Sequence, residues 1–393
     1  MADDFQLPKK KAAIFWPVGT GDSTTLVLRP DQLVMQIDLR HLEKAECDDE
    51  PEWPIIDHLR RILPKRAGRP YLAVFVLTHP DKDHIQGFAE LRKHVDIGEL
   101  WHTPKIFRDQ DDEVMCDDAK VFRREAHRRR EAILANPDNI RSGNRLRVIG
   151  HDDVLNEDKY QHLPTSCKSI PGHIVQTADG VNLDGHFEAF IHAPFKDDMA
   201  DCKNNTSLSL NIVLREGQGV GQFFFFGDRE YPTIKQIFEV TEENGNEDYL
   251  TWDVMLSSHH CSKCVMYWKD EGAEDATLHS DIMDYFEKYA RGNAAIVASA
   301  HADFTDEDGD NPPHQRAREA YEGIVTPGRF ICTHEYPSER SARPMVFTVD
   351  ERGVHLEDAR SSSTRPAGLA TAVEVARGAS TPPGVQVGFG KAK

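Results

Sequence analysis

The chain has 393 residues, of which 39% are hydrophobic and 29% are charged, a balance that is typical of a folded globular protein and excludes a largely disordered one. The formal net charge of −19 excludes a protein whose whole surface binds nucleic acid through counterion release, although a local basic track stays open. Neither a membrane span of roughly 20 apolar residues nor a signal peptide nor a disulfide framework is recognisable, so we expect a cytoplasmic protein with reduced thiols.

The first 94 residues alternate between strand and helix patterns. Short apolar runs separated by a turn at Gly19 and Gly21 predict an opening hairpin. The run from Tyr71 to His79 is apolar until its end, as expected for a central strand that is covered on both faces. We expect strands at 12–16, 24–28, 33–38 and 71–79, and helices at 53–63 and 85–94.

The remaining chain divides into a loosely patterned middle, a second strand-rich part and a tail. Residues 101–203 are rich in charge and interrupted by Pro and Gly, and we expect an inserted or variable lobe there, with a helix at 118–134. Residues 360–393 are rich in small residues, and we expect them to be disordered. Between these segments we expect strands at 207–214, 222–228, 253–260 and 294–300, and helices at 232–241, 279–289 and 314–321.

The loop Thr78–His84, with the sequence THPDKDH, is the strongest chemical signal. It places His79, Asp81, Asp83 and His84 within six residues at the end of a buried strand. Imidazole and carboxylate are ligands for divalent zinc or manganese, and carboxylates this close together repel each other unless a cation lies between them. The alternative is a polar loop with a hydrogen-bonded histidine.

Two further strand ends carry similar residues. Asp228 follows a run of four phenylalanines and is expected to bridge metal ions, although it could instead cap the helix that starts near Pro232. His259 and His260 end another strand, and alternation along an extended chain allows only one of them to face the metals. A histidine pair without a ligand role stays open.

Two more features of the sequence each allow two interpretations. The arginine-rich stretch Lys120–Arg130 is either a track for phosphates or the solvated face of a helix. His314, in a Pro-rich loop, could orient a leaving group or phosphate, or have no role.

In this context the sequence resembles the metallo-β-lactamase superfamily, and within it the branch of ComEC-type competence proteins. Asp81 stands where most members of the superfamily have a second histidine, which is characteristic of that branch. Leu39 and Cys261 stand where glycine is usual, and no histidine of the third superfamily motif can be placed. The matching segments are, in order, Val18–Val27, Gln36–Asp38, Thr78–Gly87, Asn205–Ser207, Phe226–Asp228, Ser258–Ser262 and Asn311–His314.

The resemblance implies an α/β metallo-β-lactamase fold, a four-layer αββα sandwich, over residues 1–359 with the insertion at about 101–203. It implies a site for two divalent metal ions, zinc or manganese. The expected metal ligands are His79, Asp81, Asp83, His84, Asp228 and either His259 or His260, of which His259 aligns with the first histidine of the family motif. Asp81, Asp83 and His314 are expected to take part in catalysis, and Asn205, Ser207 and Lys263 to contact substrate.

The reaction implied is hydrolysis of a phosphodiester, so we expect a nuclease or phosphodiesterase acting on nucleic acid or another phosphodiester. One alternative is a hydrolase of a lactone, thioester or β-lactam, which needs a narrow apolar pocket. Another is a metal-stabilised binding module that contacts a protein partner through the middle lobe.

Overall fold

Two β-sheets organise the part of the chain that the structure describes. The structure is a computed structural model, which describes residues 5–42, 53–108, 115–200, 204–307 and 311–358. Phe5–Glu357 form one compact unit. The tail predicted to be disordered, 360–393, lies outside the described residues.

The first sheet combines an antiparallel half with a parallel half. Strands β3, β5, β6, β7 and β8 run parallel to one another, whereas β21, β20, β1, β2 and β3 pair antiparallel. The order across the sheet is β21 (Gly353–Leu356), β20 (Met345–Asp350), β1 (Lys11–Phe15), β2 (Thr24–Arg29), β3 (Leu33–Ile37), β5 (Arg69–Val76), β6 (Asp96–His102), β7 (Arg145–Ile149) and β8 (Lys168–Ser169), and β4 (Lys65–Arg66) pairs with β5.

The second sheet has the same mixed character. Strands β14, β15, β18 and β19 are parallel, and β9, β12, β13 and β14 are antiparallel. Its order is β19 (Phe330–Cys332), β18 (Ala290–Ala298), β15 (Trp252–Leu256), β14 (Gly219–Phe225), β13 (Ser209–Glu216), β12 (Phe187–Ala193) and β9 (Ile174–Val175). Two short ribbons, β10 (Thr177–Ala178) with β11 (Val181–Asn182) and β16 (Tyr267–Trp268) with β17 (Thr277–Leu278), complete the described strands.

Alternate residues of each strand point to opposite faces of its sheet. Residues from one face of each sheet form a single shared core, so the two sheets pack face to face. In β14 and the residue after it, Phe223 and Phe225 belong to the core between the sheets, and Phe224 and Phe226 belong to the core beneath the helices. Phe225 stacks on Phe15 of the first sheet with ring centroids 6.3 Å apart. The four consecutive phenylalanines therefore fill two cores at once.

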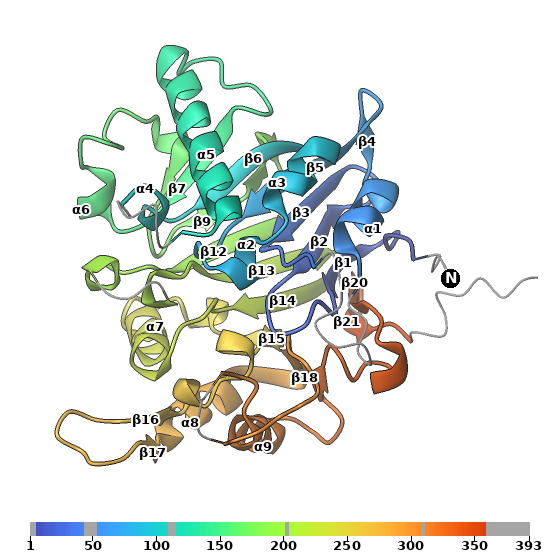
Figure 1. Ribbon diagram of the computed structural model, residues 1–393, viewed down its shortest axis with the longest axis vertical. Coiled ribbons are helices and arrows are strands. Elements are labelled where there is room, and N and C mark those ends of the chain that lie inside the picture. The colour runs from blue at the N-terminus through green and yellow to red at the C-terminus, as the bar shows by residue number, and fades with distance from the viewer. Residues whose placement is uncertain (1–4, 43–52, 109–114, 201–203, 308–310, 359–393) are drawn as a thin grey trace, which may run out of the picture. The chain divides into compact units, whose positions relative to one another are not determined.

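Helices cover the outer face of each sheet (Figure 1). The apolar residues of α1 (Ile55–Ile62), α3 (Phe88–His94) and α5 (Asp117–Ala135) pack on the first sheet. Those of α7 (Tyr231–Glu243), α8 (Ser280–Tyr289) and α9 (Gln315–Ile324) pack on the second. The short helices α2 (Lys82–Ile85), α4 (Lys105–Arg108) and α6 (Asp152–Leu155) lie in connections. The chain is thus an α/β protein with two mixed sheets.

The predicted helices and strands named above are confirmed within a few residues of their ends, except that the final residues of 253–260 form a turn rather than strand. The segment 101–203, expected as an insertion, contributes β7 and β8 to the edge of the first sheet and β9 and β12 to the edge of the second. It is therefore built into both sheets. Within the described ranges, none of the helices has the length and apolar character needed to cross a lipid bilayer.

Candidate metal centre

The loop after β5 brings two buried histidines together. His79 and His84 are 1% and 0% exposed, and their ring centroids lie 4.1 Å apart. Asp81 is the residue before α2, and His84 lies on that helix. The imidazole of His84 points toward His79 at the strand end. The loop therefore presents both imidazoles at one edge of the first sheet.

Asp228 reaches the same place from the second sheet. Its Oδ1 lies 3.1 Å from Nε2 of His84, and its Oδ2 lies 3.6 Å from Nε2 of both His79 and His260. Gly227 before it has φ +64°, and a Cβ there would lie 2.7 Å from Cβ of Ser207. A glycine is thus needed for the turn that places Asp228 between three imidazoles.

The turn after β15 selects His260 for the cluster. His259, His260 and Cys261 have φ values of 49°, 52° and 67°, so the chain is not extended here. The Nε2–H of His260 donates a hydrogen bond to Oδ2 of Asp83 at 3.1 Å. His259 instead places Nδ1 3.8 Å from Glu230 Oε1. The structure thus brings His260 to Asp228, although His259 is the histidine that aligns with the family motif.

Two aspartates that the sequence did not single out as site residues complete the cluster. Asp22, in the loop between β1 and β2, has Oδ1 3.3 Å from Nδ1 of His260. Asp38, directly after β3, accepts hydrogen bonds from the backbone N–H of Thr78 and from its hydroxyl, at 2.8 and 2.6 Å. Two features of the sequence could have pointed to them: Asp22 directly follows the glycine turn, and Asp38 ends a predicted strand.

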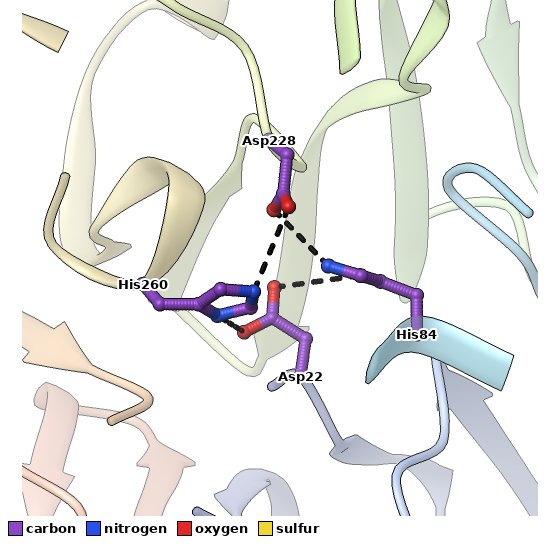
Figure 2. Close-up of side chains that lie close together, drawn as sticks. All are labelled: Asp22, His84, Asp228 and His260. Carbon is purple, nitrogen blue, oxygen red and sulfur yellow. Dashed lines mark ion pairs between the residues drawn. The ribbon is translucent and has the colours of Figure 1, made fainter. Parts of the chain in front are cut away.

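Asp22, His84, Asp228 and His260 form a buried group that could hold a metal ion (Figure 2). Each offers one ligand atom, and these atoms lie within 4.8 Å of one another. The side chains come from four separate connections, and Figure 2 shows them converging on one point. Imidazole nitrogen and carboxylate oxygen suit zinc or manganese.

The carboxylates and imidazoles of this group stabilise each other's charged forms. Burial alone would lower the pKa of His260, but the carboxylates of Asp228 and Asp22 outweigh it and raise that pKa to about 10. Burial would likewise raise the pKa of Asp228, yet the neighbouring imidazoles of His84 and His260 lower it well below its ordinary value. Without a metal ion, the protons of the histidines balance the carboxylates.

The hydrogen bonding of the group is incomplete, which fits a metal ion. The buried Nε2 of His79 has no hydrogen-bond partner among the described residues. The pairs His84 Nε2–Asp228 Oδ1 and His260 Nδ1–Asp22 Oδ1 approach to 3.1 and 3.3 Å but lack the geometry of a hydrogen bond. Leaving such atoms unsatisfied costs free energy, typically about 1–3 kcal/mol each. A cation between them would satisfy the Nε2 atoms and the carboxylate of Asp228.

An open cavity of about 420 Å³ adjoins the cluster. Asp83 and His260 line it from the cluster, and His259 lies on its wall. Arg40 and Lys82 add two cationic side chains, and Thr20, Gln86, Asn311 and Pro312 complete the lining. The cavity is therefore polar and carries positive charge beside the candidate ligands.

Several predicted catalytic and substrate residues lie elsewhere in the structure. His314 is 1% exposed; its Nδ1 accepts a hydrogen bond from the backbone N–H of Lys263, and its own N–H donates to the carbonyl of Cys261. Ser207 accepts a hydrogen bond from the N–H of Asp228 at 3.3 Å. His314 and Ser207 thus support the loops that carry His260 and Asp228, and neither they nor Lys263 belong to the cavity wall.

Asp81 and Asn205 are the remaining predicted residues. Asp81 lies beside the cluster, with Oδ2 3.7 Å from Nε2 of His79. Asn205 falls in the turn η3 (Asn204–Thr206), and its side chain is outside the described part of the structure.

Comparison with known proteins adds no family. No protein-family model and no curated protein matches the chain. One similar solved structure is the crystal structure of a protein of unknown function from Enterococcus faecalis V583, with 10% identity over 70% of this chain. The match spans 55% of that protein, at a TM-score of 0.29, and carries no argument about fold or function.

Proposed function

We propose that this protein is a metal-dependent phosphodiesterase of the metallo-β-lactamase fold, and specifically a nuclease, with a site for two divalent ions. The observation that carries the proposal is the convergence of His79, Asp83, His84, Asp228 and His260 on one buried point beside an open cationic cavity. The sequence resemblance to ComEC-type proteins covers the segments that carry these residues, with His259 rather than His260 aligned to the first histidine of the motif.

The architecture supports the fold part of the proposal. Two mixed sheets pack face to face with helices on both outer faces, as the four-layer αββα sandwich requires. The candidate ligands follow the ends of β5, β14 and β15, at the edge where the two sheets meet. There the backbone N–H of Leu208 donates to the carbonyl of Thr78, linking the two sheets.

Two ligand groups share Asp228. Asp22, Asp83, His84 and His260 would hold one ion together with Asp228, and His79 and Asp81 would hold the other, so that Asp228 would serve both groups. When bound, two such ions acidify a water molecule and stabilise the charge that develops on the scissile group. The second group has fewer ligands, in keeping with the missing third-motif histidine.

The cavity favours a phosphodiester over a lactone or thioester. Lys82 on its wall would hold the anionic phosphate next to the ligands. Arg40, which is buried and donates to the carbonyls of Val18 and Thr20, would add positive charge behind it, and His259 stands between the cavity and Glu230. A neutral apolar ester would gain nothing from these cations, and burying an unpaired charge against it costs free energy. This protein's own residues would therefore bind and orient an anion.

The test is hydrolysis of linear DNA, circular DNA, RNA and bis-p-nitrophenyl phosphate with Mn²⁺ or Zn²⁺. Wild type is compared with Asp228→Asn and with the control Asp57→Asn, which alters an exposed aspartate on α1. We expect metal-dependent cleavage that Asp228→Asn loses by at least about 100-fold and Asp57→Asn retains. Hydrolysis of lactone or thioester probes in place of every phosphodiester, or no hydrolysis by metal-loaded protein, would reject the proposal.

A further inference from the structure

A second cavity, of about 490 Å³, lies at the amino ends of β5 and β6. The metal ligands follow the carboxyl end of β5 instead. Since a strand rises about 3.3 Å per residue, Tyr71 in this cavity and Thr78 at the metal centre are roughly 23 Å apart. The two sites are therefore separate.

Three arginines share one buried carboxylate beside this cavity. Glu125 of α5 is 4% exposed and pairs with Arg92 at 2.7 Å and with Arg128 and Arg129 at 2.8 Å each. Burial alone would raise the pKa of Glu125, but hydrogen bonds from Arg128 and Arg129 outweigh it and lower that pKa to about 2. The carboxylate is thus charged, and it can neutralise only one of its three partners.

A similar imbalance surrounds Asp179. This buried carboxylate pairs with Arg66 at 3.0 Å and Arg145 at 3.5 Å, and it accepts a 2.6 Å hydrogen bond from the hydroxyl of Tyr71. The remaining acid on the cavity wall, Asp96, is balanced by Arg69. On the cavity wall itself, Arg66, Arg92 and Arg129 face Asp96 and Glu125. With the partners of these residues and with Asp179 and the adjoining Glu99 and Arg147 included, seven arginines lie near four carboxylates, which leaves an excess of three positive charges around the cavity in a protein whose net charge is −19.

The arginines on the cavity wall differ in their exposure and in how many of their N–H groups already donate hydrogen bonds. Arg129 is 3% exposed and donates to the carbonyls of Ile97, Gly98 and Arg145, so it is committed to the structure. Arg66 and Arg92 have side chains 60% and 36% exposed, and each uses one terminal nitrogen for its carboxylate. Within the described ranges their other guanidinium N–H groups have no hydrogen-bond partner, although the guanidinium of Arg66 lies over the ring of Tyr71 and that of Arg92 over the ring of Phe88. The two arginines line the cavity from two different elements.

We propose that this cavity binds a small multivalent oxyanion of the phosphate class, such as a diphosphate group, between Arg66 and Arg92. A guanidinium presents a planar fork of N–H donors that matches two oxygens of a phosphate. The excess of three positive charges suits a ligand with several negative charges better than a monovalent anion. This site stands on its own evidence and does not depend on the proposed hydrolase activity.

The experiment is calorimetric titration of the full chain with pyrophosphate at constant ionic strength. EDTA is present, so that phosphate cannot bind through a divalent ion, and sulfate serves as the weaker divalent comparison. The test variant is Arg66→Gln/Arg92→Gln. The matched control is Arg60→Gln/Arg316→Gln, which removes the same charge at two exposed ion pairs elsewhere.

We expect saturable binding of one pyrophosphate, weakened about tenfold or more in the test variant and within about twofold of wild type in the control. Single Arg66→Gln, which changes an exposed side chain, keeps the test valid should the double variant misfold. Absence of saturable binding, or equal weakening in the control, overturns the proposal. The proposal is also overturned if pyrophosphate does not bind and a 5′-phosphorylated oligonucleotide does, with binding that the Arg66→Gln/Arg92→Gln variant weakens.

Discussion

Asp38 Oδ2 lies 2.7 Å from Nδ1 of His84, and the other ring nitrogen of His84 lies 3.1 Å from Asp228. A carboxylate on Nδ1 keeps the proton there, so that Nε2 presents its lone pair to a cation. Asp38 is itself held by the backbone N–H and hydroxyl of Thr78. The orientation of one candidate ligand is thus built into the first sheet.

Replacing Asp38 by Asn should therefore weaken metal binding without removing a ligand. Asn can accept from His84 or from the N–H of Thr78 with its single oxygen, but its NH₂ group opposes the other donor. We expect about a 10- to 100-fold loss in Mn²⁺ or Zn²⁺ affinity, the range typical of such supporting residues. Competition with a chelating dye measures it, with Asp57→Asn as control; an unchanged affinity would contradict the orienting role.

Gly227→Ala should destabilise the protein through two separable effects. At φ +64° an alanine is strained, and its Cβ would also meet Cβ of Ser207 at 2.7 Å. Gly245 has φ +69° with open space around its Cβ position, so Gly245→Ala carries the strain alone. We expect a loss of about 1 kcal/mol for Gly245→Ala and at least about 2 kcal/mol for Gly227→Ala in urea unfolding. Equal losses would rule out the steric contact.

The sequence pointed to those parts of the candidate metal centre whose residues are neighbours in the chain. His79 and His84 come from one loop, and Asp228 directly follows an apolar run that could only be a buried strand. Asp22 contacts His260 and Asp38 contacts His84, and each partner is more than 45 positions away in the chain. No local sequence pattern predicts such a contact. Strand β20 was missed for the same reason, because it pairs with β1 from the far end of the chain.

The choice between His259 and His260 was inaccessible for a different reason. Positive φ is rare for residues other than glycine, and three consecutive instances contradict any local preference. Tertiary contacts impose this turn: the N–H of His259 donates to the carbonyl of Gly227, and that of His314 donates to Cys261. The role of His314 as a support for this turn was equally hidden, since its sequence context is an ordinary Pro-rich loop.

The turn geometry predicts opposite outcomes for the two histidines. His260→Ala removes a ligand and should lower metal affinity by more than the roughly 100-fold expected for a supporting residue. His259→Ala should leave affinity within about threefold, because its imidazole lies toward Glu230 and the cavity wall. Metal titration of the two variants decides the matter. Loss of metal in His259→Ala with retention in His260→Ala would restore the assignment made from the family alignment.

His192 makes stability depend on pH away from the metal centre. Burial lowers the pKa of His192 to about 3, and the neutral ring bonds with the hydroxyl of Thr241 and the carbonyl of Tyr249, both at 3.1 Å. The unfolded chain takes up a proton near pH 6.5, whereas the folded one does not until about pH 3. This contribution to stability is therefore complete above about pH 6.5 and is lost as pH falls toward 3.

The slope expected from this one group is about 1.4 kcal/mol per pH unit between those limits. His192→Gln keeps a donor for Tyr249 and cannot be protonated, so it should lose that slope while sharing every other acid-sensitive group with wild type. Urea unfolding of both proteins at pH 7, 6, 5 and 4, with EDTA in all samples, isolates the difference. The free energy of unfolding of wild type should decline faster than that of the variant below pH 6.5. Parallel curves would mean that His192 is protonated, or exposed to water, in the folded protein.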